Sequence, residues 1–276
     1  MQTIQNTLLK VIFTLTIALV SGGLVHAGAG VEHDGSVADK TSDEQAYAKA
    51  ISTWQSVLAT YVDDEGRTDF LAIEQQPEQL KAVVDVIAEI SPASHPQLFP
   101  THEQVIAYHI NTYNALAMYG VIERGIPENF SSFFKRASFF KFRSVIIGGK
   151  KTNLYDYENK VIRPLDEPRT HFALNCMVRD CPRLPQQAFL PDLLEEQLDA
   201  AAKEFFSKPK YIRVDDEKRE VHLSSILKFY TKDFVKSGKK RDLPQYVNRY
   251  VSTPIPNDYK VHYIPYDWTI NQQPKS

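Results

Sequence analysis

The sequence lacks several features that would mark a class of protein. Neither sign of charge is in excess, because 32 lysine and arginine residues stand against 34 aspartate and glutamate residues. The formal net charge of -2 gives no electrostatic indication of a nucleic-acid partner. No internal repeat is present and no linker splits the chain, so we expect one domain with a full core. Cysteine is rare, with two residues in 276, and both lie in one short stretch.

The uncharged run near the N-terminus is too short to span a membrane. It extends from Val11 to Val25, whereas a spanning helix needs about 20 apolar residues. Small-residue patterns around Ala27 and Ala29 are of the kind that a signal peptidase cleaves. We therefore predict a signal peptide and cleavage region over residues 1–29. The mature protein would be exported, periplasmic or secreted, with no stable membrane anchor after cleavage. No cysteine lies near the cleavage point, so nothing supports a lipoprotein anchor.

The rest of the chain is expected to be a flexible mature N-terminus (30–40) followed by a single globular domain (41–276). The predicted fold class is α+β, with a largely helical N-terminal half packed on a small antiparallel sheet. Helical spacing of apolar residues predicts helices at 41–58, 80–90, 103–124, 155–162, 191–206, 224–234 and 243–251. Alternating patterns predict hairpins over 144–154 and 211–223 and a last strand over 261–266.

The predicted helix 103–124 is apolar around nearly its whole circumference, which is typical of a central, buried helix. Asn111 and Asn114 lie three positions apart on it. A buried amide needs partners, because an unpaired one costs roughly 1 to 3 kcal/mol. These amides therefore either tie down neighbouring loops or serve a catalytic site, by orienting a histidine or donating to an oxyanion.

Aromatic and basic residues alternate over 130–151, where six lysines and arginines lie among phenylalanines. In a cytosolic protein such a surface would raise the question of single-stranded nucleic acid. Because we predict export, we expect no nucleic-acid partner. The stretch is interpreted as a solvated face above buried phenylalanines, or as an anion-binding rim.

Both cysteines lie close to a histidine. Residues 170–176 are predicted to form a short buried strand, which would place His171 on one face and Cys176 among apolar neighbours on the other. Cys181 follows in a turn between two arginines, whose charge would favour a thiolate. In an oxidising compartment, cysteines five positions apart are also easily bridged. The residues thus leave open two thiols with different roles or one disulfide.

Several blocks of the sequence resemble the domain of unknown function 547 family. They are Ala107–Ala115, Leu154–Glu158 with Ile162–Pro164, His171–Cys176 with Cys181-Pro182, and Tyr266–Trp268 with Asn271. The resemblance runs in order from about Glu103 to Asn271. This sequence departs from the family pattern at His109, usually tryptophan, at Glu167, usually aspartate, and at Asp180, commonly serine or glycine. The family has no established activity, so the resemblance implies no reaction type.

The first functional hypothesis is a cysteine-dependent hydrolase or acyl transferase of papain or transglutaminase type. Such chemistry needs a thiolate, an imidazole within hydrogen-bond reach and a polar group that orients the imidazole. The expected catalytic residues are the nucleophile Cys181, with Cys176 as second choice, the base His171, and the orienting groups Asn111 or Glu158. The expected binding residues are Asn114, His109, Asn175, Arg169, Asp267 and Trp268, with His109 as a substitute base.

The second hypothesis is a non-enzymatic module that a Cys176–Cys181 disulfide stabilises and that binds an unknown small molecule or peptide. A third, zinc held by His171 and both cysteines, has a C-x4-C spacing at the edge of the usual range and no evident fourth ligand. We therefore expect no metal and no cofactor. Cα atoms of the cysteines closer than about 7 Å would favour the bridge. A cleft that sets a histidine against free Cys181 would favour the enzyme.

Overall fold

The computed structural model describes residues 35–274, and for residues 35–41 the backbone alone. The predicted signal peptide (1–29) lies outside the described residues. Among the helices that are described, none combines the length and the apolar character that a membrane crossing demands. The first helix, α1 (Gly35–Tyr61), begins before the predicted start at Thr41.

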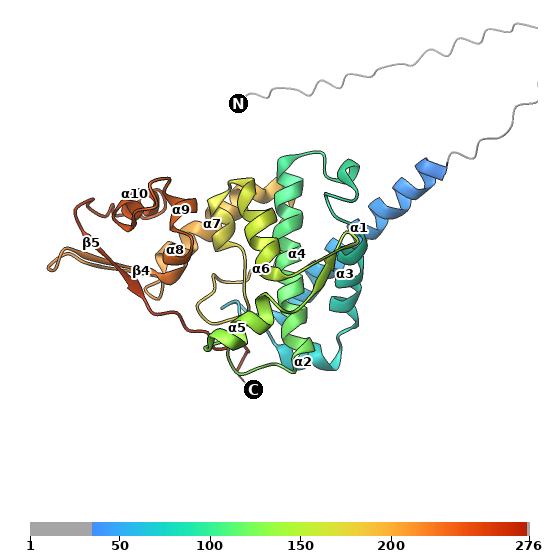
Figure 1. Cartoon of the computed structure of the whole chain (residues 1–276), viewed down its shortest axis with the longest axis horizontal. Coiled ribbons are helices and arrows are strands. Elements are labelled where there is room, and N and C mark those ends of the chain that lie inside the picture. Colours follow the sequence, from blue (N-terminus) through green and yellow to red (C-terminus); the bar gives the residue numbers. More distant parts are fainter. Residues whose placement is uncertain (1–34, 275–276) are drawn as a thin grey trace, which may run out of the picture.

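The N-terminal half of the described chain is a group of helices around α4. Helices α1, α2 (Phe70–Gln75), α3 (Glu78–Glu89) and α4 (His102–Glu123) follow in order, with α3 packed against both α1 and α4 (Figure 1). Thr101 caps α4 through a capping box with Gln104. Side chains from Ile106 to Val121 are buried on every side of α4 except at Tyr119. The predictions of helices at 80–90 and 103–124, and of a central α4, are confirmed.

The middle of the chain folds as short elements against the helices. Helix α5 (Phe133–Phe140) precedes the antiparallel hairpin of β1 (Val145–Ile147) and β2 (Lys150–Thr152). Helix α6 (Leu154–Tyr157) continues into a π turn (Glu158–Ile162). The predicted hairpin over 144–154 and the predicted helix over 155–162 are confirmed in outline.

The C-terminal part holds a three-stranded sheet with short helices beside it (Figure 1). After α7 (Leu194–Ser207), the elements are β3 (Ile212–Asp215), β4 (Glu220–Ser224), α8 (Ser225–Phe229), α9 (Thr231–Phe234), α10 (Leu243–Val247) and β5 (Lys260–Ile264). The strand order is β3-β4-β5. Because helices intervene before β5, it returns parallel to β4, whereas β3 and β4 form the predicted hairpin. The α+β class is confirmed, and this sheet is mixed rather than purely antiparallel.

The predicted strand over 170–176 is wrong. Residues Pro168–Phe172 form a 3-10 helix, and the chain continues without regular structure to the cysteines. Glu167 caps this helix by accepting a hydrogen bond from the Arg169 backbone N–H, and Pro168 occupies its first turn. Proline fits there because the first helical N–H has no partner within the helix. The expected alternation of side chains between two faces therefore does not occur.

The segment that carries the histidine and the cysteines runs between two hydrophobic cores. Phe172 packs into a core made with α7, the three-stranded sheet and α8–α10. Leu174 and Cys181 belong to the larger core around α4. Polar groups on this segment are thereby held where the two cores meet.

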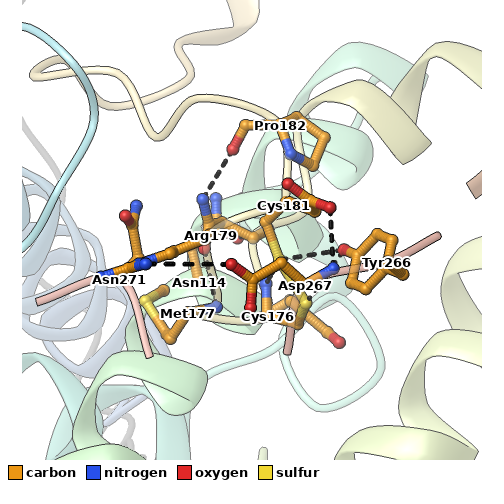
Figure 2. The surroundings of a disulfide bond; sticks show 12 residues. Asn114, Cys176, Met177, Arg179, Cys181, Pro182, Tyr266, Asp267 and Asn271 are labelled. Atoms are coloured by element: carbon orange, nitrogen blue, oxygen red, sulfur yellow. Dashed lines mark hydrogen bonds and ion pairs between the residues drawn. A yellow bond between two sulfur atoms is a disulfide. The ribbon is translucent and has the colours of Figure 1, made fainter. Parts of the chain in front are cut away.

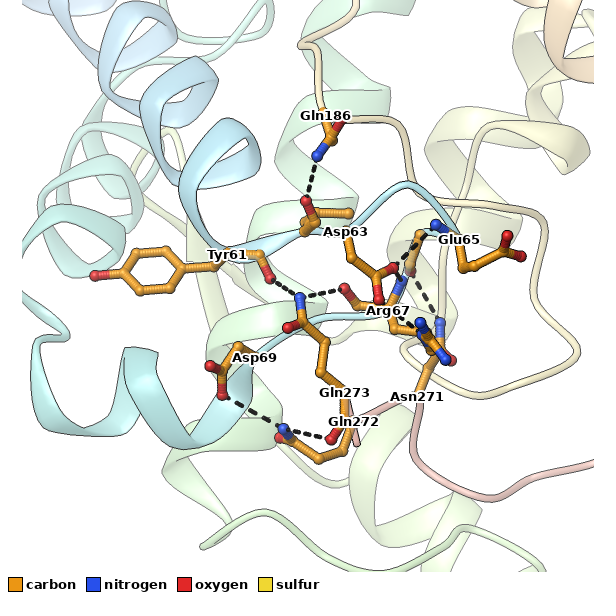
Figure 3. Close-up of polar contacts among 11 residues, drawn as sticks. Tyr61, Asp63, Glu65, Arg67, Asp69, Gln186, Asn271, Gln272 and Gln273 are labelled. Carbon is orange, nitrogen blue, oxygen red and sulfur yellow. Dashed lines mark hydrogen bonds and ion pairs between the residues drawn. The ribbon is translucent and has the colours of Figure 1, made fainter. Parts of the chain in front are cut away.

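The C-terminal residues 271–273 are fastened to the turn after α1, and we call this contact the C-terminal clasp (Figure 3). Asn271 donates from Nδ2 to the Gly66 carbonyl at 2.9 Å. Gln273 donates from Nε2 to the carbonyls of Tyr61 and Arg67, both at 3.0 Å. The clasp joins residues up to 212 positions apart, and it fixes the segment before it, which includes Tyr266 and Trp268.

Candidate functional site

A cavity of about 350 Å³ lies between α4, α5, α6 and the C-terminal segment. Its volume falls in the range of small-molecule sites. The wall is largely aromatic and includes Tyr113, Phe133, Phe140, Tyr155, Phe229, Tyr230, Tyr266 and Trp268. The charged or titratable side chains on it are Glu158, His171, Arg136 and Lys141. Both cysteines complete one side of the wall.

The two cysteines form a disulfide in this wall (Figure 2). Their Cα atoms lie 6.2 Å apart, within the range that a bridge requires. The Cys176 N–H donates to the Cys181 Sγ at 3.0 Å, and the Tyr266 hydroxyl lies 3.5 Å from the same sulfur. The alternative of one bridge is confirmed. In this state neither sulfur is a thiolate. The hydrolase hypothesis therefore lacks its nucleophile, and the zinc hypothesis lacks two of its ligands.

Asn114 and Asn175 hold the cysteine loop onto α4. The Asn114 side chain accepts from the Asn175 backbone N–H at 2.7 Å and donates to the Ala173 carbonyl at 3.0 Å. The Asn175 side chain in turn donates to the Pro182 carbonyl, beyond the second cysteine, at 2.7 Å. Both amides are buried, and neither lines the cavity. These contacts correspond to the first of the two expected roles, in which the amides hold a neighbouring loop in place.

Asn111 and His109 also face away from the cavity. Asn111 accepts from Trp54 Nε1 at 3.2 Å and exchanges hydrogen bonds with the backbone of Phe189. His109 Nδ1 lies 2.6 Å from the Tyr157 hydroxyl. Burial lowers the pKa of His109 to about 4, so its imidazole is neutral at pH 7. These residues join helices and do not act on the cavity.

His171 is oriented by Asp233, a residue that the sequence patterns do not single out. Nε2 of His171 lies 2.8 Å from the Asp233 carboxylate, and the imidazole stacks on Tyr230 at 4.0 Å between ring centroids. Arg163 binds the same carboxylate through two nitrogens. Burial alone would raise the pKa of Asp233, but Arg163 and His171 outweigh it and hold that pKa well below its usual range. Neither Asn111 nor Glu158 contacts His171 in this way.

Glu158 is a buried carboxylate on the cavity wall, with 8% of its surface exposed. It accepts a hydrogen bond from the Tyr113 hydroxyl at 3.3 Å. Within residues 42–274, no lysine, arginine or histidine lies within ion-pair distance of it. Burial and then the Glu158 charge raise the pKa of Tyr113 and of Tyr230 well above the usual value, so both remain hydroxyl donors. This part of the wall thus presents a buried carboxylate with hydroxyl donors beside it.

Of three further predicted residues, Arg169, Asp267 and Trp268, only Trp268 lines the cavity. Arg169 binds Glu167 and two acids of α7, which fastens the 3-10 helix to α7 rather than facing the cavity. Asp267 does not line the cavity either, and its carboxylate accepts a hydrogen bond from the Thr269 backbone N–H at 2.9 Å. Trp268 does line the cavity, and the Arg136 guanidinium lies 4.7 Å from its ring centroid.

The cavity therefore brings together Cys176, Cys181, His171, Glu158 and Trp268 among the predicted residues. It adds aromatic residues from α5, α6 and α8 that sequence reasoning did not choose as site residues. Only the alternation of aromatic and basic residues over 130–151 pointed to α5. Among the described residues, no group of three His, Cys, Asp or Glu side chains is placed to hold a metal ion.

The fold and the cavity define an α+β protein whose aromatic cavity carries a disulfide in its wall. Residues 97–206 match the family described as "Protein of unknown function, DUF547". The resemblance predicted from the sequence is confirmed over that segment, which contains His171, Glu158 and both cysteines. The block at 266–271 lies beyond the matched residues. Comparison with curated proteins and with solved structures found no match.

Proposed function

We propose that this protein is an exported binding protein whose cavity takes up an organic cation with an apolar body, such as an aryl or alkyl ammonium. The observation that carries the proposal is the buried carboxylate of Glu158 in an aromatic wall. Moving a carboxylate out of water is costly unless a cation or several donors compensate it. The hydroxyl groups of Tyr113 and Tyr230 compensate it in part. A ligand cation would complete the compensation.

The aromatic wall supports the same ligand class. Cations bind favourably over the faces of tyrosine, tryptophan and phenylalanine. The chain already uses two of these faces for its own cations, since Lys141 lies 4.1 Å from the Tyr155 ring centroid and Arg136 lies over Trp268. The rings of Tyr266 and Phe229 are further faces on the wall. An acidic group at the outer end of a ligand would meet Arg136 and Lys141.

The test is titration of the oxidised protein with phenyltrimethylammonium, followed by tryptophan fluorescence. Trp268 lines the cavity, whereas the other tryptophan, Trp54, is buried in the helical core. We expect saturable binding, and a loss of affinity of at least tenfold in Glu158→Gln, because the substitution removes the attraction between the carboxylate and the ligand cation, which is roughly 4 kcal/mol at about 4 Å in an effective dielectric of about 20. Glu217→Gln, an exposed acid in the β3–β4 turn, is the matched control.

The neutral isostere tert-butylbenzene separates charge from shape. If it binds as tightly as the ammonium compound, or if Glu158→Gln binds the ammonium compound normally, the cation assignment is wrong. If neither compound binds, the cavity is not a site for this ligand class.

Export is supported by the disulfide and by the uncharged run at the N-terminus. N-terminal sequencing of protein recovered from outside the cytoplasm should give a chain that begins near Gly28 or Gly30. An uncleaved chain found only in the cytoplasm would contradict this part of the proposal.

A second candidate is a cysteine-dependent hydrolase or acyl transferase that operates only after the bridge is reduced. The pairing of His171 with Asp233, on the wall that also holds both sulfurs, favours it. A thiolate would attack an ester carbonyl and expel the alcohol, leaving an acyl-thioester. We expect a burst of nitrophenolate from p-nitrophenyl acetate with reduced protein and none with Cys176→Ser/Cys181→Ser. An equal burst from both proteins would exclude this candidate.

A further inference from the structure

The most exposed large apolar side chains of the described residues belong to α5 and the residue pair that follows it. Phe134 is 81% exposed, Phe142 77% and Phe133 68%. We call these three residues the aromatic face. Three exposed phenylalanines so close in sequence exceed the scattered apolar residues of an ordinary protein surface.

The aromatic face is held rigidly by the buried side of α5. Ser132 caps the helix by accepting from the Lys135 N–H at 3.1 Å. On the inner side, Ala137 and Phe139 are buried, and Phe139 packs on Phe130 at 4.4 Å between ring centroids. Because the inner side is anchored in the core, the outer phenylalanines cannot turn inward. They are presented to the surroundings in the folded state.

The same stretch carries positive charge alone. Residues 129–155 contain six lysines and arginines and no aspartate or glutamate, in a chain with a net charge of -2. Arg143 pairs with Glu123, and Arg136 donates to the carbonyls of Phe130 and Ser131. The remaining four are exposed and, within residues 42–274, have no carboxylate at ion-pair distance; they are Lys135, Lys141, Lys150 and Lys151. The stretch that carries the exposed rings therefore also carries unpaired ammonium groups.

We propose that the aromatic face docks on the surface of an anionic lipid bilayer. Phenylalanine rings insert at the boundary between headgroups and acyl chains, and nearby lysines bind the lipid phosphates. Charge complementarity favours an anionic bilayer, because the stretch that carries the exposed rings has four exposed, unpaired lysines and no aspartate or glutamate of its own. The attachment is peripheral and needs no spanning helix. It goes beyond the proposed function and does not depend on it.

Docking would also set the cavity against the bilayer. Phe133 and Tyr155 both line the cavity and are 68% and 43% exposed, so they lie at its mouth. Phe134 and Lys141, the residue that caps the C-terminus of α5, are seven positions apart and project from one side of the helix. The cavity would thus open toward the membrane and not toward bulk solvent.

The test is sedimentation of the oxidised protein with phosphatidylglycerol–phosphatidylcholine vesicles and with pure phosphatidylcholine vesicles. We expect binding to the anionic vesicles that weakens as salt is added, and little binding to the neutral ones. Phe134→Ser/Phe142→Ser should lower the partition coefficient roughly tenfold or more. Lys135→Gln/Lys150→Gln/Lys151→Gln should lower it roughly a hundredfold. None of these residues lines the cavity, so titration with the cavity ligand or thermal melting verifies that each variant is folded.

Matched controls lie elsewhere on the surface. Leu71→Ser/Val214→Ser removes exposed apolar side chains, and Lys236→Gln/Lys239→Gln/Lys240→Gln removes exposed charge. Both should bind vesicles like the wild type. The proposal is overturned if the wild type ignores anionic vesicles, or if the controls lose as much binding as the face variants. A dimer in solution that Phe134→Ser/Phe142→Ser disrupts, without vesicle binding, would assign the face to a second copy of the chain.

Discussion

Reduction of the Cys176–Cys181 bridge should lower stability without unfolding the protein. The bridge closes a loop across a sequence separation of 5. In the chain-entropy relation such a short loop stabilises the folded state by about 2 kcal/mol. For a protein of this size that corresponds to a fall in melting temperature of roughly 4 to 8 °C. The cavity wall should keep its outline, because the loop is also fastened to α4 through Asn114 and Asn175.

The bridge should also resist reduction while the protein is folded. Cys181 is 3% exposed, and its sulfur accepts the Cys176 N–H. We expect thiol titration to find no reactive thiol before reduction, in native or urea-denatured protein, and two after reduction in urea. Melting curves with and without reductant then give the stability difference. Cys176→Ala/Cys181→Ala should melt at the lower temperature under both conditions.

Two results would refute this reasoning. Two thiols titrated in denatured, unreduced protein would mean that the bridge is not formed, and the reduced hydrolase would then become the stronger candidate. An unchanged melting temperature after verified reduction would mean that the loop is held by its amide contacts alone.

Three further predictions concern residues around the cavity. Because Arg163 and His171 lower the pKa of Asp233 below its unfolded value near 4, its stabilisation is complete above that value and is lost as the pH falls through the folded pKa. The difference in unfolding free energy between wild type and Asp233→Asn, from urea titrations, should therefore shrink as the pH falls below the unfolded value near 4. Phe172→Ala should cost about 3 to 5 kcal/mol in the same assay, because the ring is 1% exposed and packs on neighbouring phenylalanines. Asn111→Ala should lower the free energy of unfolding by about 1 to 3 kcal/mol, because it leaves the buried Trp54 indole and the Phe189 backbone N–H unpaired. It should leave the affinity for the cavity ligand unchanged, because Asn111 does not line the cavity. A loss of ligand affinity as large as the loss of stability would contradict this.

Elements with local signals could be predicted from the sequence. The all-round apolar pattern of α4 follows from its central position, and Gly148-Gly149 marks the β1–β2 turn, where both residues have positive φ. The segment at 170–176 failed because a short apolar run fits a strand or a buried turn equally well. Pro168 marked the start of a 3-10 helix there, and the pattern was interpreted as the boundary of a strand.

Part of the candidate site followed from residue chemistry and the larger part from tertiary contacts. Cysteine, histidine and buried glutamate stand out by type, and Cys176, His171 and Glu158 do meet in one cavity. A buried amide has the same appearance in sequence whether it holds a loop or a ligand, so the sequence left both roles open for Asn111, which binds the Phe189 backbone and does not line the cavity. Asp233 lies 62 positions from His171, and no local pattern records a contact made only when the two cores come together.

The C-terminal clasp has a consequence for how the chain matures. Its bonds join position 66 to position 271, so they can form only once almost the entire polypeptide is available. Contacts across such a distance form late, because the intervening chain must be ordered first. Tyr266 and Trp268 would take up their final places after the helices have assembled. During synthesis the cavity would therefore lack the part of its wall that Tyr266 and Trp268 form. A ligand would bind in the cavity only after the C-terminal segment has folded.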